Sequence, residues 1–203
     1  MASTDKRHSD PERAATRRRQ VLEAAESCFA RSGFHGASMS EISKAAGMSA
    51  GHIYNYFDSK DAIIMAFVDR RMEEVSALLR DLGSREDPLQ SMLDDASERV
   101  AEHLQPAFWT LPMEIHAEAA RNPRIAEALI AADEDSRSQF RAVLKAARER
   151  RGLAVDDATM DGRVDALISL FQGISVRALH RPQLNLDVLV EGVRIAMKAL
   201  LMT

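Results

Sequence analysis

Apolar residues recur every three or four positions along most of this chain, which is the period of an amphipathic α-helix. The alternation of apolar and polar residues that marks a half-buried strand is absent from the sequence, and so is any long repeat. The pattern therefore predicts an all-α protein of about nine helices.

Proline, glycine and capping residues divide this pattern into elements. No proline lies between Pro11 and Pro88, so one long helix is expected from Lys60 to Leu82, ended by Gly83. Beyond it we expect a helix from Pro88 to about His103, an irregular turn containing Pro106 and Pro112, a short helix to Ala120, a helix from Pro123 to Arg151 closed by Gly152, and two last helices over about 159–180 and 185–202.

Two short capped helices are predicted between residues 33 and 60. Ser38 stands three residues before Glu41, as in a capping box, and Gly47 follows the first helix where a left-handed residue commonly ends one. Ser49 then caps a second helix. Two helices joined by a tight glycine turn are typical of a helix-turn-helix, which lowers its second helix into the DNA major groove.

The second of these helices has distinct inner and outer sides. Ile53 and Phe57 are four residues apart and are expected to face inward together. The remaining side chains are left for the outer face or its rim: Ala50, Gly51, His52, Tyr54, Asn55 and Tyr56.

A longer motif surrounds the two helices, and it resembles the DNA-binding head of the TetR family of transcriptional regulators. The resemblance is specific over roughly residues 13 to 65 and weak beyond them. It rests on Arg18, Val21, Ala24, Ala25, Phe29, Gly33, Phe34, Ile42, Ala46, Gly47, Ser49, Gly51, Tyr54, Tyr56, Phe57 and Lys60. It implies a helix-turn-helix domain over 1–58 with an N-terminal arm, and a helical effector-binding and dimerisation domain over 59–203.

The resemblance also implies which residues meet DNA. Ala50, Gly51 and His52 are expected at base edges, Asn55 at bases or phosphates, and Ser49, Tyr54, Tyr56 and Lys60 at phosphates, with Ser38, the helix cap, also assigned to the interface. Lys44 is in reach from the preceding helix. The second helix contains no Arg or Lys, so the bidentate reading of guanine is absent there. For the two tyrosines, an alternative is that their rings only pack a small core.

Charge is distributed unevenly along the chain. The first 60 residues hold nine Lys/Arg and seven Asp/Glu, whereas residues 61–203 hold 18 and 24. Positive charge is bunched at Arg13, Arg17, Arg18 and Arg19, where an arm can reach phosphates or a minor groove. A solvated face is the plain alternative, but beside a helix-turn-helix the cluster favours contact with double-stranded DNA, for which Arg17 and Arg18 are the candidates.

The last two expected helices are apolar around more than one face. A wide apolar band suggests a second buried contact, and a homodimer formed as a four-helix bundle is the simplest one. The alternative is that both helices lie in the centre of the monomer. The band consists of Val164, Leu167, Ile168, Leu170, Phe171, Ile174, Val176 and Leu179, followed by Leu186, Val188, Leu189, Val190, Val193, Ile195, Met197, Leu200 and Leu201.

The body is expected to house a pocket for a small apolar or aromatic effector, although residues such as the candidates are more often plain core. The candidates are His103, Phe108, Trp109, Met113, His116, Phe140, Phe171 and Gln172. A metal site is not expected, because His116 is two residues from both Glu114 and Glu118 and points to a different helix face.

Several function classes find no support in the sequence. No catalytic or nucleotide-binding motif appears, so neither an enzyme nor a cofactor is expected. No apolar run is long enough to span a membrane and no signal peptide is visible, which favours a cytoplasmic protein. The single cysteine, Cys28, excludes an internal disulfide and is either an inert core residue or a redox sensor. A DNA-organising protein that needs no effector is the rival to a regulator.

Overall fold

The computed structural model describes residues 11–154 and 156–203, and this part of the chain forms ten α-helices and no strand. The expected all-α class is confirmed. The helices are α1 (Pro11–Gly36), α2 (Met39–Ala45), α3 (Ala50–Ile53), α4 (Lys60–Ser84), α5 (Pro88–Asp94), α6 (Ala96–Leu104), α7 (Pro106–Ala119), α8 (Pro123–Arg150), α9 (Asp157–His180) and α10 (Leu186–Met202).

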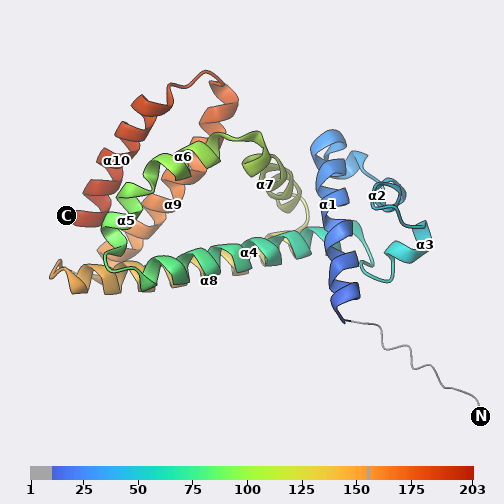
Figure 1. Ribbon diagram of the computed structural model, residues 1–203, viewed down its shortest axis with the longest axis horizontal. Helices are drawn as coiled ribbons and strands as arrows, with labels where there is room; N and C mark the ends of the chain where they lie inside the picture. Colours follow the sequence, from blue (N-terminus) through green and yellow to red (C-terminus); the bar gives the residue numbers. More distant parts are fainter. Residues whose placement is uncertain (1–10, 155) are drawn as a thin grey trace, which may run out of the picture.

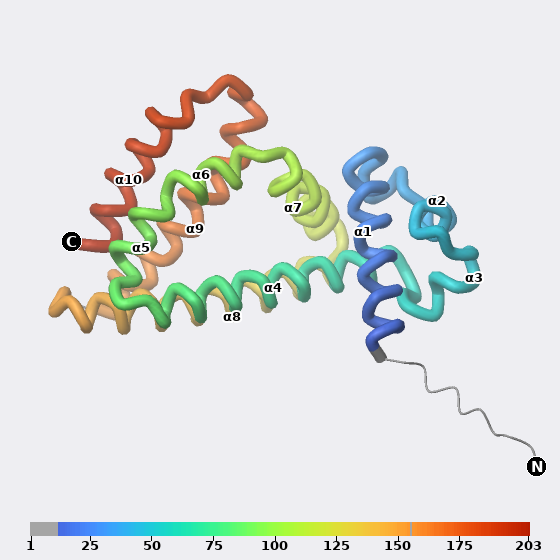
Figure 2. The backbone as a smooth tube through the Cα atoms, in the orientation of Figure 1, coloured from blue at the N-terminus to red at the C-terminus, as the bar shows by residue number. Residues whose placement is uncertain are grey.

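The helices form a small head and a larger body joined by two long helices. Helices α1, α2 and α3 make the head at one end, and α5, α6, α9 and α10 make the body at the other (Figure 1). Helices α4 and α8 run side by side along the molecule. Helix α7 leads from the end of α6 to the side of α1, so it also connects the body to the head (Figure 2).

Two elements differ from the sequence-based expectation. The helix expected from Pro88 to His103 is divided into α5 and α6 at Asp95. The ψ angle of Asp95 is −6°, which departs from the regular helical value, and its carboxylate accepts a 2.6 Å hydrogen bond from Arg85. The segment expected to be an irregular turn is helical, with Pro112 inside α7. Leu111 and Ile115 of that helix are buried, and this packing outweighs the backbone hydrogen bond that Pro112 cannot donate.

Two hydrophobic clusters hold the chain together. The first combines the inner faces of α1, α2 and α3 with the first half of α4, and with residues of α7 and α8 such as Ile115 and Ile125. It therefore crosses the boundary expected at residue 58. The second cluster lies among α5, α6, α8, α9 and α10. Cys28 belongs to the first cluster and is buried, as a core residue would be.

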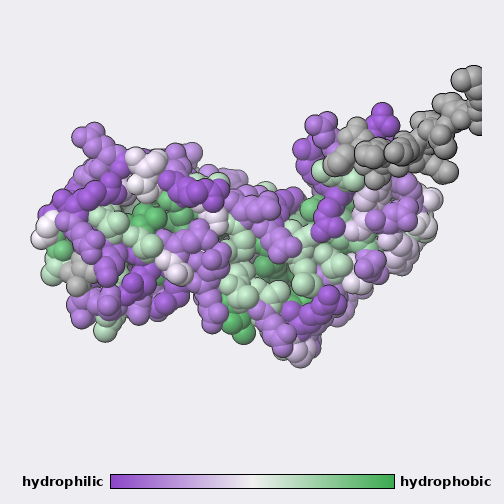
Figure 3. All heavy atoms as spheres, turned by 90° about the horizontal axis from the view of Figure 1, so that it is seen from below, coloured by the Kyte–Doolittle hydropathy of each residue, from purple (hydrophilic) through white to green (hydrophobic). Residues whose placement is uncertain are grey.

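Apolar residues also reach the surface. Seen from below, the molecule is mostly hydrophilic, and apolar side chains gather in its middle, between the body and the head (Figure 3). Among the described residues, no helix combines the length and the apolar character that crossing a membrane requires.

One buried cation fastens the end of the chain to the body. The side chain of Arg148 on α8 is only 1% exposed and donates hydrogen bonds to the carbonyl oxygens of Ala154, Leu201 and Thr203, at distances of 2.6 to 3.2 Å. The last carbonyls of a helix carry partial negative charge, so they offset the positive charge of Arg148.

The turn between α2 and α3 depends on Gly47. Its φ is 63°, its amide donates to the carbonyl of Lys44, and the next amide, of Met48, donates to the carbonyl of Ser43. These two bonds form a Schellman motif, which needs a residue in the left-handed region. The glycine turn predicted from the sequence is confirmed.

A pair of glycine substitutions tests this account of the turn. Gly47→Ala should lower the free energy of unfolding by about 1–2 kcal/mol, because an L-residue is strained at positive φ. Gly51 lies within helical α3 with open space where a Cβ would stand, so Gly51→Ala should raise stability slightly, by up to about 1 kcal/mol. Urea unfolding of both variants measures the difference. Equal stability of the two would contradict the assigned role of Gly47.

Candidate DNA-binding interface and effector region

The helix-turn-helix is built by the caps that the sequence predicted. The hydroxyl of Ser38 accepts from the amide of Glu41 at 3.1 Å, and the carboxylate of Glu41 accepts from the amide of Ser38 at 2.8 Å. These hydrogen bonds lower the pKa of Glu41. Ser49 accepts from the amide of His52 at 3.2 Å and begins α3 in the same way.

Helix α3 presents one face to the interior and the other to solvent. Ile53 and Phe57 are buried in the first cluster, as expected. The face away from them consists of exposed residues, and α3 forms the outer edge of the head (Figure 1). We call this set the α3 face: Ala50, Gly51, His52, Tyr54 and Asn55.

His52 on the α3 face is positioned by Tyr56. The Tyr56 hydroxyl lies 3.3 Å from Nε2 of His52, and the two rings meet edge to face with centroids 5.4 Å apart. Tyr56 is half-buried and packs on the first cluster, whereas Tyr54 is 51% exposed. The packing alternative for the tyrosines therefore describes Tyr56 but not Tyr54.

The arginines expected in the arm lie on α1, while residues 1–10 of that arm are outside the described part of the chain. Arg18 donates to the carbonyl of Tyr56 at 3.0 Å and stacks over the ring of Phe57 at 4.2 Å. Arg17 donates to the side chain of Gln20, and Gln20 in turn donates to the carbonyl of Ala46 at 2.7 Å. Both contacts tie α1 to the helix-turn-helix and leave Arg17 and Arg18 exposed beside it.

Lys60, expected at a phosphate, is instead bound within the protein. Its Nζ donates to the carbonyl oxygens of Phe34 and Ala37 at 2.7 and 2.8 Å, and it lies 4.5 Å from the centroid of the Phe34 ring. The end of α1 carries unpaired carbonyls that attract a cation, which explains this placement. Lys44, by contrast, is exposed on α2.

The end of α1 is also held by α7, in what we call the head–body junction. Gly33 has a φ of 68°, and the next amide, of Phe34, donates to the Glu114 carboxylate at 2.9 Å. The carboxylate of Glu118, on a buried side chain, lies 2.9 Å from Nε2 of His35. Helix α7 therefore contacts the head at the end of α1, the same segment to which Lys60 of α4 donates its hydrogen bonds.

Three of the expected effector residues lie together in the body. The ring of His103 contacts those of Phe108 and Phe171 in tilted arrangements, with centroid distances of 4.3 and 5.2 Å. Its Nδ1 lies 2.8 Å from the carbonyl of Arg99, and burial lowers its pKa, which favours the uncharged form of the ring. Arg71 of α4 stacks over Phe108 at 4.9 Å, which links this cluster to the long helix.

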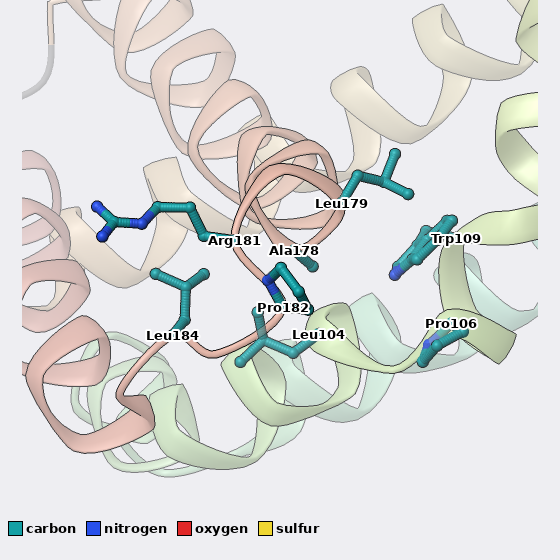
Figure 4. Close-up of a pocket in the computed structure, with 8 residues that line it drawn as sticks. All are labelled: Leu104, Pro106, Trp109, Ala178, Leu179, Arg181, Pro182 and Leu184. Atoms are coloured by element: carbon teal, nitrogen blue, oxygen red, sulfur yellow. The ribbon is translucent and has the colours of Figure 1, made fainter.

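Trp109 lines a groove next to this cluster. The groove has a volume of about 370 Å³ and opens between the start of α7 and the loop from α9 to α10 (Figure 4). Its other lining residues are Leu104, Pro106, Ala178, Leu179, Arg181, Pro182 and Leu184. Sequence reasoning missed these seven, five of which come from the end of α9 and the α9–α10 loop, segments that only the folded chain brings beside the start of α7.

The remaining effector candidates are not brought to the groove. His116 and Gln172 are exposed, since each lies on the outer side of its helix. Met113 is half-buried on α7, and Phe140 packs against the second cluster from α8. Within the described residues, no group of His, Cys, Asp or Glu is arranged to hold a metal ion, and Glu114 and Glu118 serve the junction instead.

Sequence reasoning also missed the role of Glu114 and Glu118. Two acidic residues four positions apart on a helix normally mark a solvated face. The only local signal was Gly33, whose left-handed turn exposes the amide that Glu114 accepts from.

Comparison with known proteins agrees with this geometry. Residues 21–67 match the model of bacterial regulatory proteins of the tetR family, and residues 85–201 match the C-terminal domain of BetI-type transcriptional repressors. The regulator UidR of Escherichia coli is 34% identical over 116 residues, which are 55% of this chain and only 56% of UidR. The regulator CymR of Pseudomonas putida is 27% identical over 181 residues, 86% of this chain and 85% of CymR.

Solved structures show the same architecture. The structure of GusR from Salmonella enterica superimposes with a TM-score of 0.72 and 27% identity over 93% of this chain and 96% of GusR. These relatives are transcriptional regulators, in agreement with the prediction that the chain is a regulator and not an enzyme. From the capped helix-turn-helix and the two family matches, we conclude that this chain belongs to the TetR family of bacterial regulatory proteins.

Proposed function

We propose that the protein is a transcriptional repressor that binds a palindromic DNA operator as a homodimer and is released by a small apolar or aromatic effector. The observation that carries the proposal is the α3 face, a set of exposed side chains held by two caps at the outer edge of the head. In a twofold dimer the two α3 faces would enter successive major grooves, about 34–36 Å apart.

Recognition of DNA bases by the α3 face relies on side chains other than Arg and Lys. His52 and Asn55 can form hydrogen bonds to base edges, and the methyl group of Ala50 can touch a thymine methyl. Gly51 has open space above it, which permits close approach of a base pair. Lys44, Arg17 and Arg18 supply positive charge beside this face for phosphates.

The dimer is supported by apolar stripes on α9 and α10. Many of the apolar residues expected on these helices are buried within the monomer, such as Val164 and Met197. Others stay exposed: Val176 and Leu179, three residues apart on α9, Val188 and Ile195, seven residues apart on α10, and Leu186 at the start of α10. Gly173 and Gly192 lie within the same stripes with open space above them. A second copy packed there would bury these residues in a four-helix bundle.

Release of the operator requires that effector binding changes the position of the two heads relative to their bodies. Two of the helices that connect the head to the body, α4 and α7, supply the side chains of the head–body junction, Lys60 and Glu114. At its other end α7 carries Trp109 and Phe108, next to the groove. An effector that moves α7 would therefore shift Phe34 and change the spacing of the two α3 faces, and by linkage operator DNA would weaken effector binding by the same factor.

A first prediction separates base reading from phosphate contact. His52→Ala should change the order of preference among single-base variants of the operator, because His52 reads a base edge. Lys44→Ala should weaken binding to all of them alike and reduce the salt dependence by about one counterion. Fluorescence anisotropy at several salt concentrations measures both. An unchanged order of preference in His52→Ala would contradict the base-reading role.

A second prediction concerns the dimer. Val188→Glu and Ile195→Glu place a charge on residues that are 71% and 64% exposed in the monomer, so the monomer should still fold. Dimerisation should weaken by several kcal/mol, because the charge would be buried without a partner. The matched control is Ile130→Glu, which changes a residue 59% exposed on α8, away from these stripes. Sedimentation velocity that shows dimers of all three variants would contradict the proposed interface.

A third prediction concerns coupling through the junction. Glu114→Ala removes the acceptor of the Phe34 amide, whereas Glu114→Gln keeps an acceptor oxygen in place. The alanine variant should bind operator but lose most of the effector response, which in regulators is typically about 5- to 150-fold in affinity. The glutamine variant should keep it. Operator titrations with and without a releasing effector make the comparison, and a full response in the alanine variant would exclude α7 as the connection.

A further inference from the structure

Tyr56 stands beside the α3 face and is held by contacts on two sides. Its ring packs against the first hydrophobic cluster, and its backbone carbonyl accepts a 3.0 Å hydrogen bond from Arg18 of α1. Its hydroxyl lies 3.3 Å from Nε2 of His52, a residue that is exposed on the α3 face. Because the tyrosine is anchored and the histidine is not, Tyr56 orients His52 rather than the reverse.

The direction of this hydrogen bond decides which nitrogen of His52 carries the proton. A neutral imidazole has one N–H and one bare nitrogen, so a nitrogen that accepts a hydrogen bond leaves the proton on the other. An imidazole nitrogen takes up a proton near neutral pH, whereas the oxygen of a neutral phenol does not. The nitrogen is therefore the better acceptor, which favours donation by the Tyr56 hydroxyl to Nε2 and a proton on Nδ1.

Nδ1 is the remaining polar atom of the exposed His52 ring. Within residues 11–154 and 156–203, no hydrogen bond engages this nitrogen. In the major groove guanine presents two acceptors, O6 and N7, whereas cytosine presents the N4 amino donor. An N–H at Nδ1 matches guanine and opposes cytosine. A bare Nδ1 would have the opposite preference, so the tautomer of His52 selects the base.

We propose that Tyr56 is a positioning residue that sets the base preference of His52. Its hydroxyl donates to Nε2, the ring proton stays on Nδ1, and Nδ1 donates to O6 or N7 of a guanine in the operator. Tyr56 thereby acts on base recognition and not at a phosphate, where the family resemblance places its side chain. This assignment rests on the proposed function, because it names the base that one residue of the α3 face reads.

Nitrogen-15 NMR of the full-length protein without DNA tests the tautomer, at about pH 8.5, above the range in which histidine is usually charged. The spectrum of His52→Ala identifies the His52 signals among the six histidines. His52 should carry its proton on Nδ1. Tyr56→Phe keeps the packed ring but removes the hydroxyl, and should shift His52 to the Nε2–H form that unconstrained histidines favour. An Nε2–H ring in the wild type, or an unchanged ring in Tyr56→Phe, would overturn the proposal.

Operator binding tests the base preference. The probe is a duplex that the wild-type protein selects from random-sequence DNA, with each base pair placed in turn at the position where His52→Ala changes the ranking. The wild type should bind guanine there about two- to tenfold more tightly than cytosine, as one hydrogen bond allows. Tyr56→Phe should remove this difference. The control Tyr54→Phe removes a hydroxyl from an exposed tyrosine of the same face and should keep it. A wild-type preference for cytosine would contradict the assigned donor.

Two further outcomes separate the possible failures. If Tyr56→Phe weakens binding to every duplex by the same factor and keeps the wild-type ranking, the hydroxyl contacts a phosphate and the positioning role is overturned. If the wild-type protein selects no duplex from random-sequence DNA, the proposed function is overturned. Selective DNA binding together with an Nε2–H ring on His52 overturns this inference alone.

Discussion

The left-handed turn at Gly33 is the constraint on which the arrangement of head and body depends. The turn redirects the end of α1 and frees the Phe34 amide and two carbonyl groups from regular helical pairing. Glu114 accepts from the amide, and Lys60 donates to the carbonyls. One short segment is thus held by an anion from α7 and a cation from α4. A Cβ at Gly33 would stand 3.3 Å from the Glu114 carboxylate, which is a tight contact, and the positive φ is the feature that requires glycine.

This junction sets the orientation of the helix-turn-helix. The inner sides of α2 and α3 pack on α1 and on the first half of α4, so the four helices share one hydrophobic cluster. Side chains at the surface of the head add further contacts, since Arg18 donates to the carbonyl of Tyr56 and the Tyr56 hydroxyl contacts His52. Because α3 has only four residues, its caps and these contacts, rather than its own hydrogen bonds, determine where the α3 face points.

The apolar residues of α9 and α10 fall into two sets, one buried and one exposed. One set builds the second cluster, and the other set remains on the surface as stripes on α9 and α10. The groove adjoins the same region, since Leu179 belongs both to the groove lining and to the exposed stripe. The stripe, the groove and the start of α7 are therefore neighbours, which places the proposed dimer contact and the proposed effector site within one part of the body.

The sequence by itself determined the features that depend on local chemistry. The capping box at Ser38, the Gly47 turn, the inward pair of Ile53 and Phe57 and most helix ends follow from interactions within a few residues, so they were predicted correctly. Tertiary structure decided the rest. Pro112 lies inside a helix because burial of Leu111 and Ile115 outweighs one lost hydrogen bond, and Lys60 turns inward because carbonyls 23 to 26 residues away attract it. The groove and the role of Glu114 likewise join residues about 70 to 80 positions apart, a distance over which no local pattern carries information.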